Sequence, residues 1–162
     1  MIRHAAESDL PRILEIYDVA RQFMRQSGNM TQWINGYPSE PLLRQDIMTG
    51  NLYVMEDEGG VYCVFALVTG DDPTYAEIEG AWQDTATPYG TIHRLASKGT
   101  AHGVARACFD FCTGLSDYVR VDTHADNRAM QAAIEGYGFR KCGNIYASSG
   151  TLRTAYDYVR EG

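Results

Sequence analysis

The start of the chain predicts a short strand, and hydrophobic positions at helical spacing predict a helix after it. Ile2–Ala5 is short and is expected to form a first strand. Apolar residues then recur at helical spacing over Leu10–Ala20, and the pattern carries this first helix to about Met24. Ser8 is the expected N-cap, because its hydroxyl can accept a hydrogen bond from an unpaired backbone N–H of the first turn.

A long polar segment separates this helix from a predicted hairpin. Gln26–Glu40 is rich in Gly, Asn and Gln, and a loop of that length in a small domain is usually functional or mobile. Ser39 is expected to open a second short helix. Leu52–Glu56 and Val61–Val68 are rich in β-branched and aromatic residues, and the turn at 57–60 contains two glycines. These features predict a β-hairpin.

The middle of the chain predicts a strand, a glycine-containing loop and a helix in succession. Gly70–Tyr89 is polar, with a short irregular helix expected near Ala76–Trp82. Tyr89–Ala96 is the expected strand and Ser97–Gly103 the loop. The helix that follows, Val104–Leu115, has an apolar face. Such a loop offers backbone N–H groups and the positive end of a helix dipole to an anion, so phosphate is the first ligand to test.

The last third of the chain predicts a strand, a helix and a closing hairpin. Tyr118–Thr123 has strand character, and Asp126–Tyr137 carries an apolar stripe at helical spacing. Phe139–Ala147 and Leu152–Val159 are the expected arms of the hairpin. Helices and strands therefore alternate with few strand–helix–strand crossovers. This order predicts a single α/β (α+β) domain over residues 1–162, with a mixed central sheet of about seven strands and helices on both faces.

Composition excludes several classes of protein. The chain has 162 residues, of which 44% are hydrophobic, so it can bury a core. Its net charge of −7, without a cluster of Lys and Arg, argues against nucleic-acid binding. No apolar run is long enough for a membrane span, and no signal peptide is visible. The four cysteines lie in predicted strands and a helix, which favours free thiols and a reducing, cytoplasmic compartment.

Two motifs in the central stretch resemble those of the GCN5-related N-acetyltransferase (GNAT) family. The phosphate-loop motif of that family, Gln/Arg-x-x-Gly-x-Gly/Ala, aligns with Thr100-Ala-His-Gly-Val-Ala105. Asn127 follows the fifth predicted strand, and Gly138-Phe139 comes about a dozen residues later, as in the family. The order of elements matches over essentially the whole chain.

The resemblance implies an acetyl-CoA site between the fourth and fifth strands, which would splay apart. The pantetheine arm would pair with the backbone of the fourth strand, and the loop N–H groups would hold the pyrophosphate. Gly103 would leave room for the closest phosphate contact. The residues implied to bind the cofactor are Leu95, Ala96, Ser97, Thr100, Ala101, His102, Gly103, Val104, Ala105 and Asn127.

The sequence departs from the family pattern at two positions. Thr100 replaces the long polar residue at the start of the phosphate loop, with Lys98 and His102 as candidates to compensate. Ile134 stands where many members carry a tyrosine that acts as general acid. Isoleucine cannot transfer a proton, so this role lies elsewhere or is taken by water.

Acetyl transfer to an amine needs a base, because an alkyl ammonium ion is mostly protonated near neutral pH. His93 is the first candidate, since it lies on the fourth predicted strand just before the cofactor-pairing residues. Asp122 and His124 lie at the end of the neighbouring strand and share side-chain parity. Tyr146 is an alternative acid. The histidines show no tight metal-binding spacing, so no metal is expected.

The sequence therefore predicts an acetyl-CoA-dependent transferase that acts directly on a small or amino-acid-like amine. Direct transfer is favoured because no cysteine lies at a helix start or beside a histidine. Trp33 and Tyr37 of the long loop are the candidates for the acceptor pocket. A non-catalytic acyl-CoA-binding module of the same fold and an unrelated phosphate-binding α/β domain remain alternatives. The closing hairpin, with Tyr156 and Tyr158, could form an intersubunit edge, which leaves a homodimer open.

Overall fold

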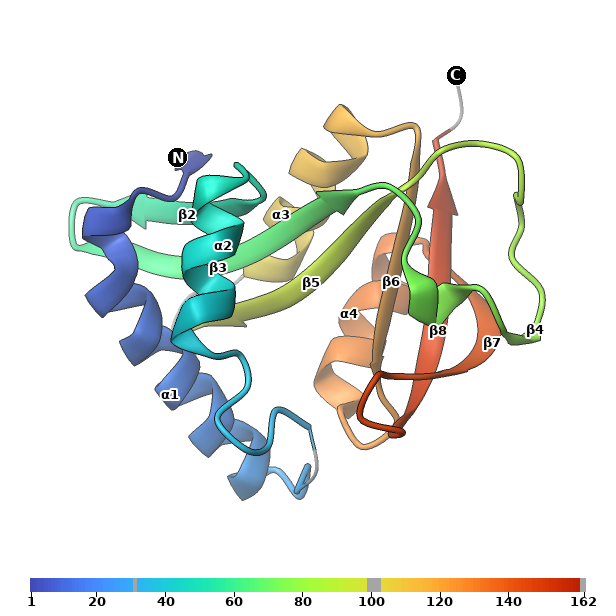
Figure 1. The fold of residues 1–162 in the computed structure, drawn as a ribbon, viewed down its shortest axis with the longest axis horizontal. Helices are drawn as coiled ribbons and strands as arrows, with labels where there is room; N and C mark the ends of the chain where they lie inside the picture. Colours follow the sequence, from blue (N-terminus) through green and yellow to red (C-terminus); the bar gives the residue numbers. More distant parts are fainter. Residues whose placement is uncertain (31, 99–102, 161–162) are drawn as a thin grey trace. The chain divides into compact units, whose positions relative to one another are not determined.

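The structure is a computed structural model that describes residues 1–30, 32–98 and 103–160. These residues form four α-helices, eight strands and two 3-10 turns (Figure 1). Two compact units are distinguished by their internal contacts, Met1–Leu67 with Arg94–Val104, and Val68–His93 with Ala105–Gly162. Strand β5 (Gly90–Ser97) contributes to both units, because its first half belongs to the second unit and its second half to the first.

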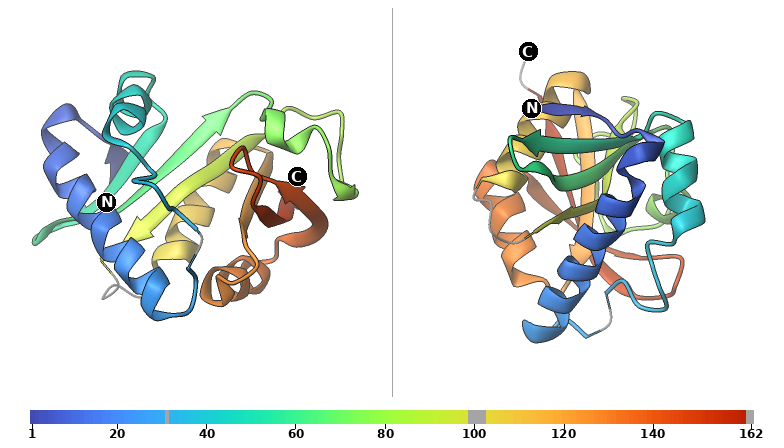
Figure 2. Two further views of the ribbon diagram at one scale, coloured as in Figure 1. Left: turned by 60° about the horizontal axis from the view of Figure 1, so that its bottom comes forward. Right: turned by 90° about the vertical axis from the view of Figure 1, so that its left-hand side faces the viewer.

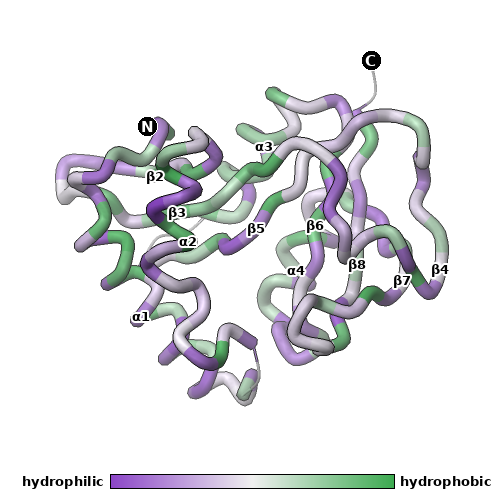
Figure 3. The backbone as a smooth tube through the Cα atoms, in the orientation of Figure 1, coloured by the Kyte–Doolittle hydropathy of each residue, from purple (hydrophilic) through white to green (hydrophobic). Residues whose placement is uncertain are grey.

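The first unit contains the antiparallel strands β1, β2 and β3 together with helices α1 and α2. The bounds are β1 Ile2–His4, α1 Leu10–Gln26, α2 Glu40–Met48, β2 Leu52–Asp57 and β3 Gly60–Thr69, the last two residues of which belong to the second unit. The predicted hairpin is confirmed, with Leu52 paired to Ala66 and Asp57 to Gly60. Most of β3 is buried, and much of this strand has the green colour of hydrophobic residues in Figure 3.

The two helix starts of the first unit were predicted with different success. Ser39 caps α2 as expected, since its hydroxyl accepts from the N–H of Leu42 at 3.3 Å. Ser8 does not cap α1, because it lies inside a 3-10 turn, Glu7–Asp9, that precedes the helix. The carboxylate of Asp9 instead accepts from the N–H of Ala6 at 2.8 Å, which satisfies a donor at this end.

The second unit contains the first half of β5 followed by β6, β8, β7 and β4 in spatial order. The bounds are β4 Glu79–Gly80, α3 Val104–Leu115 (Val104 belonging to the first unit), β6 Tyr118–His124, α4 Arg128–Tyr137, β7 Arg140–Tyr146 and β8 Leu152–Val159. β5 and β6 are parallel, and the other pairs are antiparallel. Because β8 pairs with β6 on one side and β7 on the other, the proposed intersubunit edge at Tyr156 and Tyr158 was wrong.

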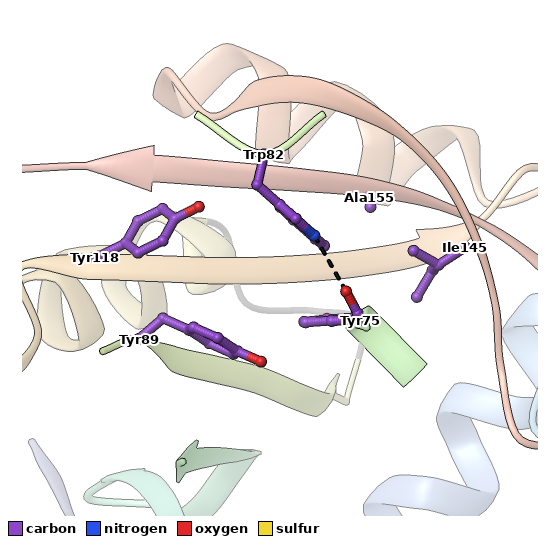
Figure 4. Close-up of a cluster of buried hydrophobic side chains, with 6 residues drawn as sticks. All are labelled: Tyr75, Trp82, Tyr89, Tyr118, Ile145 and Ala155. Atoms are coloured by element: carbon purple, nitrogen blue, oxygen red, sulfur yellow. Dashed lines mark hydrogen bonds between the residues drawn. The ribbon is translucent and has the colours of Figure 1, made fainter. Parts of the chain in front are cut away.

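The strands of the second unit separate two packed faces. Helices α3 and α4 lie on one side of β6 and β8, and the segment that leads to β4 lies on the other (Figures 1 and 2). Aromatic rings fill the helix side, with Phe109 5.0 Å from Phe139 between ring centroids. On the opposite side lies a buried cluster (Figure 4) of Tyr75, Trp82, Tyr89, Tyr118, Ile145 and Ala155.

Two charged residues, Arg120 and Asp157, are buried next to this cluster. Arg120 of β6 faces Asp157 of β8 in the antiparallel register, and their residues are only 5% and 0% exposed. The guanidinium of Arg120 lies 4.0 Å from the ring centroids of both Trp82 and Tyr89. Asp157 accepts from the hydroxyl of Tyr118 at 2.7 Å. The strands thus bury charge that is stabilised by aromatic faces and by hydrogen bonds.

The segment between β3 and β5 differs from its prediction. No helix forms near Ala76–Trp82 in the described chain; a 3-10 turn, Pro73–Tyr75, and the two-residue strand β4 take its place. β4 pairs with β7 where Gly80 meets Gly143. A Cβ at Gly80 would lie 2.1 Å from the carbonyl oxygen of Cys142, so only glycine permits this approach. The described sheet strands therefore number eight rather than about seven.

Candidate active site

The parallel pairing of β5 with β6 ends abruptly. It covers three residue pairs, the last of which is Ile92 with Val121. β5 nevertheless continues to Ser97 and β6 to His124. His93 and Asp122 are the first residues beyond the last pair. Two candidate residues named from the sequence therefore lie where the pairing stops.

His93 is hydrogen-bonded to a carboxylate that sequence reasoning did not identify. Its Nε2 lies 2.9 Å from Oδ2 of Asp72, and the two side chains are 25% and 15% exposed. Asp72 is the N-cap of the Pro73–Tyr75 turn and also accepts from the N–H and hydroxyl of Thr74. Burial alone would raise the pKa of Asp72, but the hydrogen bonds from His93 and Thr74 outweigh it and hold the pKa at about 2. An ionised Asp72 makes Nε2 the donor, which leaves Nδ1 of His93 as the basic nitrogen.

Asp122 is tied to the same turn. Its Oδ1 accepts from the hydroxyl of Tyr75 at 2.6 Å, and its Oδ2 lies 3.7 Å from Nη1 of Arg153. Burial, with the charge of Asp122 adding to it, raises the pKa of Tyr75 well above the ordinary value, so this hydroxyl keeps its proton. One short turn, residues 72–75, thus supplies a partner both to His93 and to Asp122.

His124 lies on the same face of β6 as Asp122, as the side-chain parity predicted, but its ring accepts a hydrogen bond from the turn that follows the strand. Its Nδ1 accepts from the N–H of Asp126 at 3.0 Å, and its carbonyl accepts from the N–H of Asn127 at 2.9 Å. Burial lowers the pKa of His124, which favours the neutral ring. These contacts give His124 a structural place at the end of β6.

Tyr146 lies at the end of β7, in a more exposed setting. Its side chain is 54% exposed, and its hydroxyl donates to Glu79 at 3.2 Å. The charge of Glu79 raises the pKa of Tyr146. The hydroxyl partner therefore comes from β4, not from the turn that holds His93 and Asp122.

The described cofactor-binding candidates lie on β5 and at the starts of α3 and α4. Leu95, Ala96 and Ser97 form the end of β5, and Val104 and Ala105 begin α3. Three further candidates lie outside the described residues: Thr100, Ala101 and His102.

The start of α3 has two features that would suit a phosphate group. Gly103 has φ +73°, a left-handed conformation that other residues rarely adopt, and the space around its missing Cβ is open. The first turn of α3 carries no acidic residue that would repel an anion. Asn127, which the resemblance assigns to the cofactor, is the N-cap of α4, and its Oδ1 accepts from the N–H of Met130 at 3.2 Å.

The two acceptor candidates of the long loop lie in different surroundings. Trp33 is buried, and its ring meets that of Tyr17 edge-on at 5.5 Å between centroids. Tyr37 is 39% exposed, and its hydroxyl accepts from Nη1 of Arg94 at 3.1 Å. Tyr37 therefore offers surface to a ligand, whereas Trp33 packs within the first unit.

Arg94, the residue after His93, holds an unusual backbone conformation. Its φ is +58°, in the left-handed region that a side chain disfavours. Two nitrogens of its guanidinium bind Oδ2 of Asp46, at 2.7 and 3.1 Å, and both side chains are less than a tenth exposed. The hydroxyl of Tyr17 donates to the carbonyl of Arg94 at 2.7 Å. Contacts with both the side chain and the carbonyl thus maintain the strained residue.

Replacing Arg94 by glycine and by alanine is expected to separate the backbone from the side chain. Both variants leave Asp46 without its ion pair, but only Arg94→Ala must keep a Cβ at this φ. Arg94→Ala should therefore be less stable than Arg94→Gly by about 1 kcal/mol. Urea unfolding of the two variants measures the difference. An alanine variant as stable as the glycine variant would show that the backbone relaxes without cost.

Sequence reasoning missed Asp72 as the partner of His93, and it missed the backbone strain at Arg94 and the identity of its ion-pair partner. Asp72-Pro73-Thr74 has the form of an N-cap followed by proline, and that local signal could have located the turn. No local signal pairs Asp72 with His93 or Asp46 with Arg94, since these partners are 21 and 48 residues apart.

Two other features of the described chain bear on function. Its histidines, cysteines and acidic residues do not form a group of three or more that could hold a metal ion. None of its helices combines the length and the apolar character needed to cross a bilayer.

Several solved structures with the same fold are described as acetyltransferases. The chain is similar to a GNAT-family acetyltransferase from Streptococcus agalactiae, with 27% identity and a TM-score of 0.91 over 100% of this chain and 96% of the other. A GNAT-family acetyltransferase from Listeria monocytogenes shares 19% identity at a TM-score of 0.74, over 98% and 94% of the two chains. A ribosomal-protein-alanine N-acetyltransferase from Brucella melitensis shares 17% identity at a TM-score of 0.64, over 98% and 99%.

No protein-family model matches the sequence, and no curated protein matches it either. The fold class and the resemblance drawn from the motifs are nevertheless confirmed, because the structural similarity extends over the whole chain. Over its whole length, the chain therefore has the fold of the GCN5-related N-acetyltransferases.

Proposed function

We propose that the protein transfers an acetyl group from acetyl-CoA directly to the primary amine of a small, amino-acid-like acceptor. The observation that carries this proposal is the His93–Asp72 hydrogen bond at the end of the β5–β6 pairing. A histidine oriented by an ionised carboxylate is suited to remove a proton from an ammonium group. We assign the protein to the cytoplasm and to a single catalytic domain, 1–162; the four free cysteines support a reducing compartment.

The candidate residues have separate tasks in this scheme. Acetyl-CoA would supply the activated thioester, with its phosphates at Gly103 and the start of α3. Asp72 holds the His93 ring through Nε2, so that Nδ1 can take the proton from the acceptor amine. The amine nitrogen then bonds to the acetyl carbon as the carbon–sulfur bond breaks; the new amide nitrogen loses its surplus proton to water, and the thiolate takes up a proton. Ile134 is fully buried and apolar, so that last proton comes from Tyr146 or from water.

The cysteines support direct transfer rather than an acyl-enzyme. A cysteine nucleophile must be a thiolate, which requires a low pKa and access to the substrate. Burial raises the pKa of Cys63 to about 12 and, as the largest of several causes, that of Cys142 to about 12. Cys108 and Cys112 are fully buried in α3.

Titration calorimetry with acetyl-CoA and with free CoA tests the cofactor part of the proposal. We expect wild-type protein to bind in the micromolar range and Gly103→Val to lose at least about tenfold in affinity, because a side chain at φ +73° distorts the loop. Gly150→Val is the matched control, since Gly150 has φ +83° and similar open space but lies in the β7–β8 turn.

The outcomes separate the alternatives. Equal binding by the Gly103 and Gly150 variants would remove the phosphate loop from the scheme. Binding without amine-dependent thiol release, over a broad panel of amines, would favour a sensing module over an enzyme. No binding by the wild type would contradict the proposed cofactor.

A further inference from the structure

Arg153 of β8 is a mostly buried cation whose hydrogen-bonding capacity is not used. Its side chain is 14% exposed. Among the described residues it makes no hydrogen bond, and its Nε is buried without a partner. A guanidinium group has five N–H donors in a rigid fork. Leaving the buried Nε–H donor unpaired is costly, so this arrangement indicates a missing acceptor.

Asp122 does not fill that need. Its Oδ2 lies 3.7 Å from Nη1 of Arg153, beyond hydrogen-bond distance, although the charges attract. Its Oδ1 is already bonded to the hydroxyl of Tyr75 at 2.6 Å. The carboxylate of Asp122 thus reduces the positive charge of the site but does not accept a hydrogen bond from the guanidinium of Arg153. A fork of this kind binds carboxylates in a bidentate manner.

The position of Arg153 on β8 connects it with His93, the proposed base, through neighbouring residues. Arg153 pairs with His124 across the β6–β8 ladder, two residues beyond the position of Asp122 on β6. Asp122 is bonded to Tyr75, and His93 is bonded to Asp72 of the same short turn. Asp122 and His93 are therefore both bonded to the turn at residues 72–75, and Arg153 lies next to Asp122, all within the second unit.

The charge balance favours a carboxylate over a phosphate. Asp122 repels any anion that binds at Arg153, and it repels a doubly charged phosphate more strongly than a singly charged carboxylate. The pyrophosphate of acetyl-CoA has its own fitting site at Gly103 and α3. We propose that Arg153 binds the carboxylate of the acceptor and thereby presents its amine to His93. This inference rests on the proposed function and narrows the acceptor to an amine that carries a carboxylate.

Matched acceptors test the proposal. The twenty free amino acids, their carboxamides and the corresponding decarboxylated amines are each assayed with acetyl-CoA. We expect wild-type kcat/KM to favour the carboxylates by about 10- to 100-fold, the value of a hydrogen-bonded charge. Arg153→Met should remove this preference through the acceptor KM and leave the acetyl-CoA KM unchanged. Arg153→Lys should restore part of it, because it keeps the charge without the fork.

A double variant distinguishes recognition from simple charge balance. If Arg153 only neutralises Asp122, then Asp122→Asn in the Arg153→Met background should restore the carboxylate preference. If Arg153 binds the acceptor, the double variant should remain unselective. Wild-type protein with no preference for carboxylates over carboxamides, or Arg153→Met with an unchanged preference, would overturn the inference.

A binding measurement separates this inference from the proposed function. Acetate, with acetamide as the neutral control, should raise the unfolding midpoint of wild-type protein more than that of Arg153→Met. That result would support the anion site even if acetyl-CoA failed to bind. Acetyl-CoA binding together with equal effects of acetate on both proteins and unselective turnover would leave the transferase standing and reject the role of Arg153.

Discussion

His93→Ala is expected to lower kcat by about 100- to 10,000-fold, the range found for loss of a general base. The alanine variant removes the imidazole that is hydrogen-bonded to the carboxylate of Asp72 at the end of the β5–β6 pairing. Steady-state kinetics with acetyl-CoA and a reactive amine measure the effect. The affinity for acetyl-CoA, measured by calorimetry, should change little, because the cofactor phosphates are assigned to Gly103 and α3.

Two companion variants make the result specific. His4→Ala removes a histidine that stacks on Tyr53 of the first unit and should retain near wild-type turnover. Asp72→Asn should lower kcat less than His93→Ala, since it disturbs the orientation of the ring but leaves the base in place.

The pKa of Asp72 is about 2, so its carboxylate is ionised at every pH above about 4. Asp72 therefore contributes no step to the activity profile between pH 5 and 9. Turnover by His93→Ala within twofold of wild type would exclude His93 as the base.

Asp157→Ala is expected to lower the free energy of unfolding by about 3–5 kcal/mol, the cost of breaking a buried charge network by removing one partner. Asp157 is completely buried and accepts hydrogen bonds from Tyr118 and from the backbone and side chain of Gln83. Its removal leaves the charge of Arg120 buried between Trp82 and Tyr89 without the opposite charge across the ladder.

Urea unfolding at neutral pH measures this loss, and two controls frame it. Asp157→Asn keeps an acceptor of the same shape and should cost less than the alanine variant. Asp117→Ala removes a carboxylate that is 76% exposed and paired with Arg160, and it should change stability by less than about 1 kcal/mol. If Asp157→Ala lowers the free energy of unfolding no more than Asp117→Ala does, the buried network contributes nothing to stability.

Sequence patterns predicted the elements whose structure depends on local periodicity. The β2–β3 and closing hairpins, the two helices beyond β5 and the Ser39 cap all follow from apolar spacing and turn residues. The segment between β3 and β5 was predicted poorly because its structure depends on distant partners. Tyr75 reaches Asp122 over 47 residues, and Gln83 reaches Asp157 over 74.

The candidate site shows the same division. His93 and Asp122 could be chosen from their titratable groups and their places near strand ends, and the structure puts both just beyond the last β5–β6 pair. Asp72, Arg94 and Arg153 could not be chosen, because their importance lies in a partner, a backbone angle and an unsatisfied donor. These properties exist only in the folded chain.

The short turn at residues 72–75 also has a consequence for the order of folding. Its bonds to His93 and Asp122 close loops of 21 and 47 residues, whereas neighbouring strands such as β7 and β8 are joined by a short turn. Closing longer loops costs more chain entropy, so contacts near in sequence form first. The β7–β8 hairpin should therefore form before the turn docks. Until the turn docks, the histidine would lack its carboxylate partner, and the chain would have no competent base.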